Sequence, residues 1–468
     1  MYKKAKQTLS QLPPEYQTEL LPDIRREFLQ STKTVVVFDD DPTGTQTCYD
    51  VVVLTSWSVA AIAEELKKKP SILFILTNSR SLSGSEAVEL TNEVGINLKK
   101  ACEQTGRDVV VISRSDSTLR GHFPGEVSAI ARSLHMEQAI WVLVPAFIEG
   151  GRFTIDDVHY IVEQNELVPV SETPFAQDKS FGYNHSNVRE WVEEKTAGAV
   201  EASDVVSISI EEIRSRGPES VSRKLSACRP GQVVLVNAAS YKDLEVFAMG
   251  LIAAERAGKK FLLRSSATFV SIRAGIAPGK ILKLSGVQKA DRGSLIVVGS
   301  YVPKTTSQLD HLLAQGKHEA MEISVAEIIA SSENSIASGA VSKKIDEWLG
   351  KGRDVVIYTS RQLEAGIDSE SSLRINRAVS DFLVHVISQL TVRPSFFIAK
   401  GGITSSDLAS KALIAGKALI LGQAIPGVPV WELDEKSKFP KILYIVFPGN
   451  VGGTSALWEV WYRFKYNI

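Results

Sequence analysis

The sequence predicts an α/β protein of two domains, each with a mostly parallel sheet flanked by helices. Short runs of β-branched and other apolar residues alternate with stretches of helical periodicity, a pattern typical of parallel sheets covered by helices. The runs are apolar throughout rather than alternating in polarity, as expected for strands buried on both faces. The chain has 468 residues, more than one hydrophobic core usually serves.

The first domain is expected at residues 31–285, after a charged helical extension at residues 1–30. Its predicted strands are at residues 34–38, 71–76, 108–112, 139–144 and 233–236. Its predicted helices are at residues 59–68, 85–104 and 125–134.

The strand and helix pattern restarts after Gly293, which predicts a smaller second domain at residues 290–468. Its predicted strands are at residues 295–298, 354–358, 395–398 and 442–447. Its predicted helices are at residues 308–314, 343–349 and 375–390. The segment 277–292 contains APGK and DRG and is the expected boundary.

The composition argues against several classes of protein. Charged residues make up 23% of the chain and the net charge is -1, so nothing points to nucleic acid or an anionic membrane as a partner. The three cysteines form no CxxC, which argues against a disulfide framework or a cysteine-rich zinc site. The polar N-terminus lacks the apolar core of a signal peptide, and no apolar run could span a bilayer. We therefore expect a cytoplasmic protein with reduced thiols.

The stretch FDDDPTGTQT, which follows the first predicted strand, carries Asp39, Asp40 and Asp41. Ligands of open α/β sheets bind outside the carboxyl ends of the strands. Carboxylates there could accept hydrogen bonds from hydroxyls, act as a base or hold a metal. The alternative is that they only cap a turn, since Asp, Pro, Thr and Gly are common turn residues.

Two further strand ends carry polar residues. Asn78 and Arg80 lie in TNSRSLSG, and Ser115, Asp116 and Arg120 lie in SRSDSTLRGHFPGE. A guanidinium suits a carboxylate or phosphate, whereas serine and aspartate suit a polyol. Alternatively, the arginines only form ion pairs with the aspartates. His122 in the same segment is at least as well explained as a structural histidine, and the later stretch VPAFIEGGRFTIDD fits a pocket loop or a hairpin equally well.

Three glycine-rich strand ends distinguish the second domain. They are VVGSYVPKTT with Ser300, AKGGITSSD with Gly401, Gly402 and Thr404, and FPGNVGGTSA with Gly449 and Gly452. Glycine-rich loops before helices present backbone N–H groups to phosphates, which predicts nucleotide binding. The chain lacks GxxxxGK[ST], GxGxxG, HExxH and GxSxG, so a P-loop, a dinucleotide fingerprint, a zinc hydrolase and a serine esterase are not indicated.

In this order, the motifs resemble those of the four-carbon acid sugar kinase family. The resemblance extends from about Val35 to Ser455 and includes SETPFAQD and PGVP. It departs from the family pattern in two places: relatives commonly have one or two aspartates in the first motif, and Ile403 stands where they have glutamate. The resemblance implies an N-terminal domain for a four-carbon sugar acid, a C-terminal domain for ATP with Mg²⁺, and an active site in the interdomain cleft.

The resemblance also implies roles for individual residues. Arg120, with Arg80 as the alternative, is expected to pair with the carboxylate of a tetronate or 3-oxo-tetronate. Asp39 and Asp41 are expected to hold its hydroxyls, one of them orienting or deprotonating the attacking hydroxyl, which is expected to be O4. The other residues expected at the sugar acid are Asp40, Asn78, Ser115 and Asp116. Those expected at the ATP are Ser300, Gly401, Gly402, Thr404, Gly449 and Gly452.

Two other functions fit the same pockets. A sugar-acid aldolase or isomerase would need no nucleotide, and a sensor of sugar acid or nucleotide would bind without turnover. The metal ligands, the tetronate stereoisomer and the existence of a homodimer are left open by the sequence.

Overall fold

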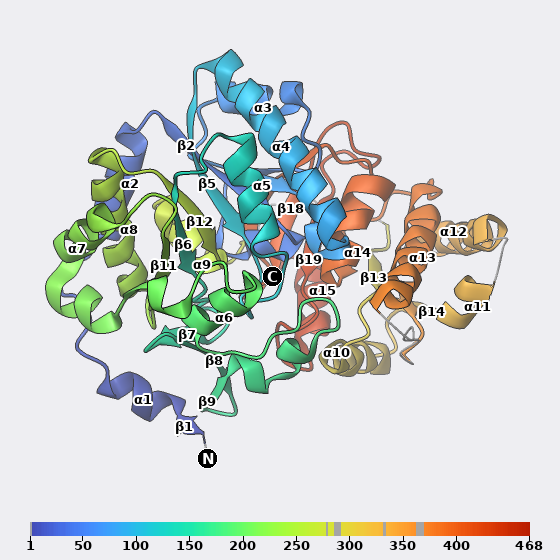
Figure 1. Cartoon of the computed structure of the whole chain (residues 1–468). Coiled ribbons are helices and arrows are strands. Elements are labelled where there is room, and N and C mark those ends of the chain that lie inside the picture. The colour runs from blue at the N-terminus through green and yellow to red at the C-terminus, as the bar shows by residue number, and fades with distance from the viewer. Residues whose placement is uncertain (1, 278, 285–291, 331–333, 362–368) are drawn as a thin grey trace. The chain divides into compact units, whose positions relative to one another are not determined.

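The computed structural model describes residues 2–277, 279–284, 292–330, 334–361 and 369–468 (Figure 1). The chain forms two compact units: Met1–Asp40 with Trp57–Pro278, and Asp41–Ser56 with Gly279–Ile468. A short segment after the first long strand therefore belongs to the second unit. Within the predicted boundary, residues 278 and 285–291 lie outside the described residues.

The first unit contains a parallel sheet in the order β10-β11-β6-β12-β5-β2-β4. The strands are Val206–Ile208 (β10), Val233–Val236 (β11), Ile140–Val144 (β6), Phe261–Ser265 (β12), Asp108–Arg114 (β5), Lys33–Asp39 (β2) and Ile72–Leu76 (β4). The predicted strands of this domain are confirmed, whereas β10 and β12 were not predicted. The chain passes from β2 to β4 on one side and later to β5 on the other, so the end of β2 lies at a switch point, where α/β proteins bind ligands.

Two groups of helices pack within the first unit (Figure 1). One group is Val59–Lys67 (α3), Gly84–Thr105 (α4) and Gly125–Ser133 (α5), and all three were predicted. The other is Leu21–Gln30 (α2), Ile210–Ala227 (α7), Tyr241–Arg256 (α8) and Ala267–Arg273 (α9). The helices Ala5–Gln11 (α1) and α2 give the N-terminal extension its predicted helical character, and Val188–Lys195 (α6) follows later in the chain.

A small antiparallel sheet also belongs to the first unit. Its strands are Lys3–Lys4 (β1), Glu166–Pro169 (β9), Val158–Glu163 (β8) and Arg152–Ile155 (β7), in that order. Phe147 and Arg152 exchange backbone hydrogen bonds of 3.0 and 2.9 Å around Gly150 and Gly151. The stretch VPAFIEGGRFTIDD therefore forms a hairpin turn into β7.

The second unit has a mixed sheet in the order β3-β17-β18-β19-β16-β13-β15-β14. The strands are Val51–Leu54 (β3), Lys417–Gln423 (β17), Pro429–Leu433 (β18), Leu443–Phe447 (β19), Phe397–Lys400 (β16), Leu295–Val298 (β13), Val355–Thr359 (β15) and Glu319–Ile323 (β14). From β19 to β14 the strands are parallel, which confirms the predicted parallel sheet in this part. The antiparallel strands β3, β17 and β18 were not predicted.

The helices of the second unit are Pro303–Ala314 (α10), Val325–Ala330 (α11), Asn334–Gly350 (α12), Ser369–Ser388 (α13), Gly402–Asp407 (α14) and Ala456–Tyr466 (α15). Its core includes Ile296, Phe447 and Trp461, all buried. The chain leaves β13 toward β15 on one side and toward β16 on the other, so Ser300 follows the switch-point strand of this sheet. No helix in the described part of the chain combines the length and apolar character needed to cross a membrane.

Candidate functional site

The carboxyl edge of the first sheet holds a buried set of ion pairs. Asp39 and Arg114 are paired in register at the ends of β2 and β5. Arg114 Nη1 lies 3.0 Å from Asp39 Oδ1 and 3.0 Å from Asp40 Oδ1. Asp39 is 0% exposed, so its charge is compensated inside the protein.

Asp40 connects most of the residues that the motifs predicted for the sugar acid. The Ser115 hydroxyl donates to Asp40 Oδ2 at 3.0 Å, and Arg80 Nε lies 3.2 Å from the same oxygen. Arg80 Nη1 reaches Asp116 Oδ1 at 3.1 Å. The predicted residues Asp40, Arg80, Ser115 and Asp116 are thus brought together.

Asp116 and Arg120 form a second pair. Arg120 Nε lies 3.0 Å from Asp116 Oδ2, and its Nη1 lies 3.3 Å from Asp178 Oδ2. Burial alone would raise the pKa of Asp116, but the guanidinium groups of Arg120 and Arg80 outweigh it, and the pKa lies well below its ordinary value. Asp116 is therefore an anion that these two arginines neutralise.

The loops of this cluster are shaped by two special backbone positions. Asn78 has φ 51° and begins the 3₁₀ turn Ser79–Ser81. Gly121 has φ 118°, and a Cβ there would lie 2.6 Å from Ser115 Oγ and 3.4 Å from Asp40 Oδ2. A side chain at position 121 would clash with Ser115, so the packing of the cluster requires glycine there.

Glu126 lies beside the cluster and was not among the predicted site residues. Its Oε1 accepts a hydrogen bond of 2.5 Å from Ser79 Oγ. Burial and the nearby charge of Asp40 raise the pKa of Glu126 to about 7. His122, in the same segment, has its Nε2 3.0 Å from the Ser79 carbonyl oxygen, and burial lowers its pKa. His122 is thus hydrogen-bonded to the loop that carries Ser79.

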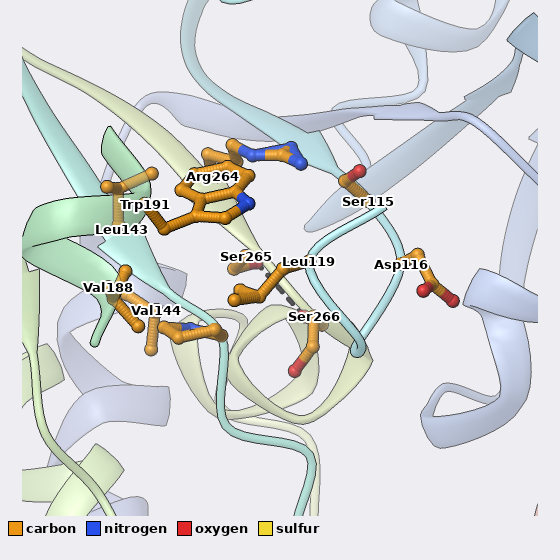
Figure 2. Close-up of a pocket in the computed structure, with 11 residues that line it drawn as sticks. Ser115, Asp116, Leu119, Leu143, Val144, Val188, Trp191, Arg264, Ser265 and Ser266 are labelled. Carbon is orange, nitrogen blue, oxygen red and sulfur yellow. Dashed lines mark hydrogen bonds between the residues drawn. The ribbon is translucent and has the colours of Figure 1, made fainter. Parts of the chain in front are cut away.

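Arg264, at the end of β12, is a second residue that the motifs did not indicate. It is 7% exposed, and its guanidinium carbon lies 5.2 Å from the Phe123 ring centroid and 5.5 Å from that of Trp191. Figure 2 shows its guanidinium directed toward Ser115 at a small cavity. The signal was present: FLL followed by RSS is another apolar run that ends in polar residues.

The second unit brings its three glycine-rich loops together, because they follow the adjacent strands β13, β16 and β19. The Thr305 hydroxyl lies 3.3 Å from Ser300 Oγ and donates to the Gly449 carbonyl oxygen at 3.1 Å. A Cβ on Gly449 would lie 3.1 Å from Ser300 Oγ. Gly401 has φ 122° and donates its N–H to the Phe447 carbonyl oxygen at 2.9 Å. The predicted nucleotide residues Ser300, Gly401 and Gly449 are therefore neighbours.

The other predicted residues of these loops are Gly402, Thr404 and Gly452, and each lies at or near the start of a helix. Gly402 and Thr404 are in the first turn of α14, whose leading N–H groups have no partner within the helix. A Cβ on Gly299 would lie 2.1 Å from Thr404 Oγ1, so the first and second loops touch. Gly452 has φ 84°, and a Cβ there would lie 2.4 Å from Ala456 Cβ at the start of α15. Gly452 therefore permits the close entry of the chain into that helix.

Lys400, at the end of β16, holds the loop that contains Pro448 and Gly449. It is 0% exposed, and its Nζ donates to the Pro448 carbonyl oxygen at 2.7 Å. The same nitrogen lies 4.1 Å from the Phe447 ring centroid. Burial, with a smaller effect of the Lys304 charge, lowers the pKa of Lys400 to about 6. Lys400 belongs to the KGG motif but was not predicted as a site residue.

Asp41 belongs to the second unit, unlike the two aspartates before it. Its Oδ1 accepts the Thr43 N–H at 2.8 Å and so caps the 3₁₀ helix Pro42–Thr47. A Cβ built on Gly402 would lie 2.2 Å from Asp41 Oδ2, so the carboxylate packs directly against the KGGIT loop. The acidic triplet is thus divided between the ion-pair cluster of the first unit and the glycine-rich loops of the second.

A metal centre made by the protein alone is not found in the part of the chain that is described: no group of three or more His, Cys, Asp or Glu side chains there is arranged to hold an ion. Mg²⁺ in enzymes that act on nucleotides usually needs only one or two carboxylates besides the phosphates and water. Asp41 beside Gly402 fits that requirement.

Known proteins resemble the chain along most of its length. A sugar-binding N-terminal domain family matches residues 35–273, and a nucleotide-binding C-terminal domain family matches residues 295–457. The D-threonate kinase of Salmonella typhimurium is 25% identical over 443 residues, covering 92% of this chain and 97% of the relative.

Two solved structures share the fold. A Salmonella typhimurium LT2 protein with the provisional description tRNA synthase has a TM-score of 0.65 at 14% identity, covering 92% of this chain and 98% of that one. A Haemophilus influenzae protein has a TM-score of 0.58 at 16% identity, covering 92% of this chain and 100% of that one. At these identities the two structures support the architecture alone.

The kinase relative and the two domain families, both matched in chain order, support phosphoryl transfer rather than aldolase or isomerase chemistry or ligand sensing without turnover. The chain belongs to the four-carbon acid sugar kinase family and is a carbohydrate kinase with a sugar-binding and a nucleotide-binding domain.

Proposed function

We propose that this kinase transfers the γ-phosphate of Mg²⁺-ATP to the O4 hydroxyl of a tetronate or 3-oxo-tetronate. One observation carries the proposal: carboxylates and guanidinium groups alternate around Asp40 at a switch point of the first sheet. Such a cluster offers acceptors for hydroxyls and cations for an acid, the two functional groups of a sugar acid. The D-threonate kinase relative supports the same substrate class.

The O4 position follows from the chemistry of the substrate. The carboxylate is C1, and O4 is the hydroxyl at the opposite end of a four-carbon chain. If cations at the cluster hold the carboxylate, the terminal hydroxyl is the group farthest from them and the one free to act as acceptor. Asp40 and Ser115 are the proposed partners of the inner hydroxyls.

The loops of the second unit fit a nucleotide. The missing side chains at Gly401, Gly402 and Gly449 let Ser300 and Asp41 pack closely against these loops, and the first-turn N–H groups of α14 are of the kind that bind phosphate oxygens. Bound Mg²⁺ would neutralise charge on the phosphates. Lys400 holds the Pro448–Gly449 backbone in place through its hydrogen bond to the Pro448 carbonyl.

Asp41 is the proposed residue for the attacking hydroxyl. It is the aspartate of the triplet that packs against Gly402 in the nucleotide-binding unit. Its neighbour in the chain, Asp40, belongs to the first unit and contacts Arg80 and Ser115. Phosphoryl transfer depends mainly on positioning and charge neutralisation, so a carboxylate that orients the hydroxyl suffices. Asp39, paired with Arg114, is proposed to hold Asp40 in place rather than to contact the hydroxyl.

A coupled assay of ADP release tests the proposal. The panel contains the threonate and erythronate enantiomers, 3-oxo-tetronates and the corresponding tetritols, with product NMR to locate the phosphate. We expect ADP release with at least one acid and a phosphate on O4. ADP release with no acid in the panel, or phosphate on another oxygen, would contradict the substrate class or the position respectively.

A further inference from the structure

Several arginine side chains of the described chain lie at or near the carboxyl edge of the first sheet, and three of them have carboxylate partners at ion-pair distance. Arg80 pairs with Asp40 and Asp116, Arg114 with Asp39 and Asp40, and Arg120 with Asp116 and Asp178. Arg264 differs from them: within the described chain, no carboxylate lies at ion-pair distance from its guanidinium.

The carboxylates of Glu126, Asp40 and Asp116 act on the Arg264 charge only from beyond ion-pair distance, and burial lowers the pKa of Arg264. The side chain makes one hydrogen bond to the described residues, from Nη2 to the Arg120 carbonyl oxygen at 3.3 Å. Its guanidinium lies close to the rings of Phe123 and Trp191, at 5.2 and 5.5 Å, and these contacts orient the plane but carry no negative charge. An arginine stays charged in proteins, and a buried cation without an anion is costly. The Arg264 guanidinium is therefore oriented by its neighbours and has no ion-pair partner, as expected for a side chain that binds an anionic group of a ligand.

The cavity next to Arg264 has the size of a single small group. It is lined by the polar residues Ser115, Asp116 and Arg264 and by apolar residues that include Leu119 and Trp191 (Figure 2). Its enclosed part has room for about one water molecule, which suits one end of a ligand rather than a whole sugar acid. Asp116 in its wall is already neutralised by Arg80 and Arg120, so it does not repel an incoming carboxylate as a bare charge would.

The competing candidate from the sequence, Arg120, is less suited to this role. Its Nε and Nη1 already form ion pairs with Asp116 and Asp178, and its guanidinium carbon lies 5.0 Å from the Phe175 ring centroid. Turning it toward a substrate would take the cation away from Asp178 and leave Asp116 with Arg80 alone, which costs free energy. Arg264 can take a carboxylate without breaking any ion pair.

We propose that Arg264 binds the C1 carboxylate of the substrate and is the residue that selects sugar acids over the corresponding sugar alcohols. Ser115, which lines this cavity and whose hydroxyl donates to Asp40, would then bind next to the C1 end. This inference rests on the proposed function, because it concerns the same site.

The test compares the wild type with Arg264→Gln on an acid and on the tetritol that lacks its carboxylate. With the best acid of the panel, kcat/KM should fall about 10- to 100-fold, the range for hydrogen bonds between charged groups. With the tetritol, kcat/KM should change less than about 3-fold, since the tetritol has no carboxylate for Arg264 to bind. The KM for ATP should stay unchanged, and Arg264→Lys should be intermediate, because it keeps the charge without the planar fork.

Arg273→Gln is the matched control. Arg273 is also a buried arginine near an aromatic ring, Phe28, but it pairs with Glu255 away from the cluster. The Arg273→Gln variant should have a lower thermal midpoint than the wild type and the same preference for acid over tetritol. If Arg264→Gln does not fold, two measurements replace it: the kinetics of Arg264→Lys, and calorimetric binding of the acid and its amide to the wild type. Equal affinity for the acid and the amide overturns the inference.

The outcomes separate the two proposals. Phosphorylation of an acid by the wild type, with full acid preference kept in Arg264→Gln, overturns the role of Arg264 and leaves the kinase proposal standing. If the wild type neither binds nor phosphorylates any acid of the panel, the proposed substrate class and this inference both fail.

Discussion

Asp39 and Arg114 occupy paired positions on the adjacent parallel strands β2 and β5, and their side chains form an ion pair of 3.0 Å. The same guanidinium nitrogen lies 3.0 Å from Asp40 Oδ1. Three like charges in succession would repel one another. Here the neighbouring strand compensates the first two, and the third lies in the other unit. The acidic run is therefore held in place by the fold itself.

Loss of Arg114 should destabilise the protein strongly. Arg114→Met would leave Asp39 and Asp40 buried beside one cation fewer, and removing one partner of a buried pair typically costs about 3–5 kcal/mol. The thermal midpoint should fall by several degrees or more. Arg26→Met is the control, because the Arg26–Asp23 pair is exposed, with Arg26 at 61% exposure, and such pairs contribute about 0–1 kcal/mol. Equal midpoints for the two variants would show that the Arg114 pairs do not stabilise the fold.

Asp41→Asn should impair catalysis with little effect on folding. Asparagine keeps the oxygen that accepts the Thr43 N–H, so the 3₁₀ cap survives. The loss of a hydroxyl-orienting or basic carboxylate typically lowers the rate by ~10²–10⁴-fold. The measurements are kcat, both KM values and the thermal midpoint. Asp50→Asn, in the same 41–56 segment but exposed, should be fully active. Full activity of Asp41→Asn would refute the role proposed for Asp41.

Gly449→Val should abolish nucleotide binding. The wild type should melt at higher temperature with millimolar Mg²⁺-ATP, because a ligand that binds only the folded state stabilises it. The first added carbon at Gly449 would already lie 3.1 Å from Ser300 Oγ and 3.4 Å from Val302 Cγ2, and valine adds two more. In Gly350→Val, where no heavy atom lies within 4 Å of the added Cβ, the thermal shift should persist. A normal shift in Gly449→Val would place the nucleotide elsewhere.

Glu126→Gln should stabilise the protein at alkaline pH. Because the pKa of Glu126 is raised to about 7 from a usual value of 4.5, the folded state binds this proton more tightly than the unfolded state. The contribution is fully present below about pH 4.5 and is lost as the pH rises through 7. The neutral amide escapes that loss, so it should exceed the wild type by roughly 2–4 kcal/mol at pH 8 and by much less at pH 5.

The comparison for Glu126 is a pair of thermal or denaturant curves at each pH. Glu103→Gln, at an exposed position on α4, should show the same difference from the wild type at both pH values. A Glu126→Gln difference that does not grow between pH 5 and pH 8 would mean that Glu126 is ionised in the folded protein throughout.

Much of the fold could be predicted because continuous apolar runs mark strands buried on both faces. The runs at residues 233–236 and 295–298 coincide with β11 and β13. The strand β12 was missed because its apolar part is only Phe261, Leu262 and Leu263 before Arg264. The antiparallel strands β3, β17 and β18 were missed because their pairing is set by partners distant in the chain, such as Val53 with Ala418. Local sequence does not encode such a register.

The sequence by itself determined the chemistry that gathers at each sheet edge: acids, arginines and serines in one domain, glycines and threonines in the other. It did so because polar and flexible residues that follow an apolar run must lie at the end of a strand, where parallel sheets place their ligand-binding loops.

The tertiary structure decided which of these charges are already paired. Arg80, Arg114 and Arg120 face carboxylates brought from other strands and loops, whereas Arg264 faces a cavity. It also placed Asp41 against Gly402, more than three hundred residues away in the chain. Electrostatic pairing depends on distances of a few ångströms between side chains, and only the packing of distant segments sets those distances.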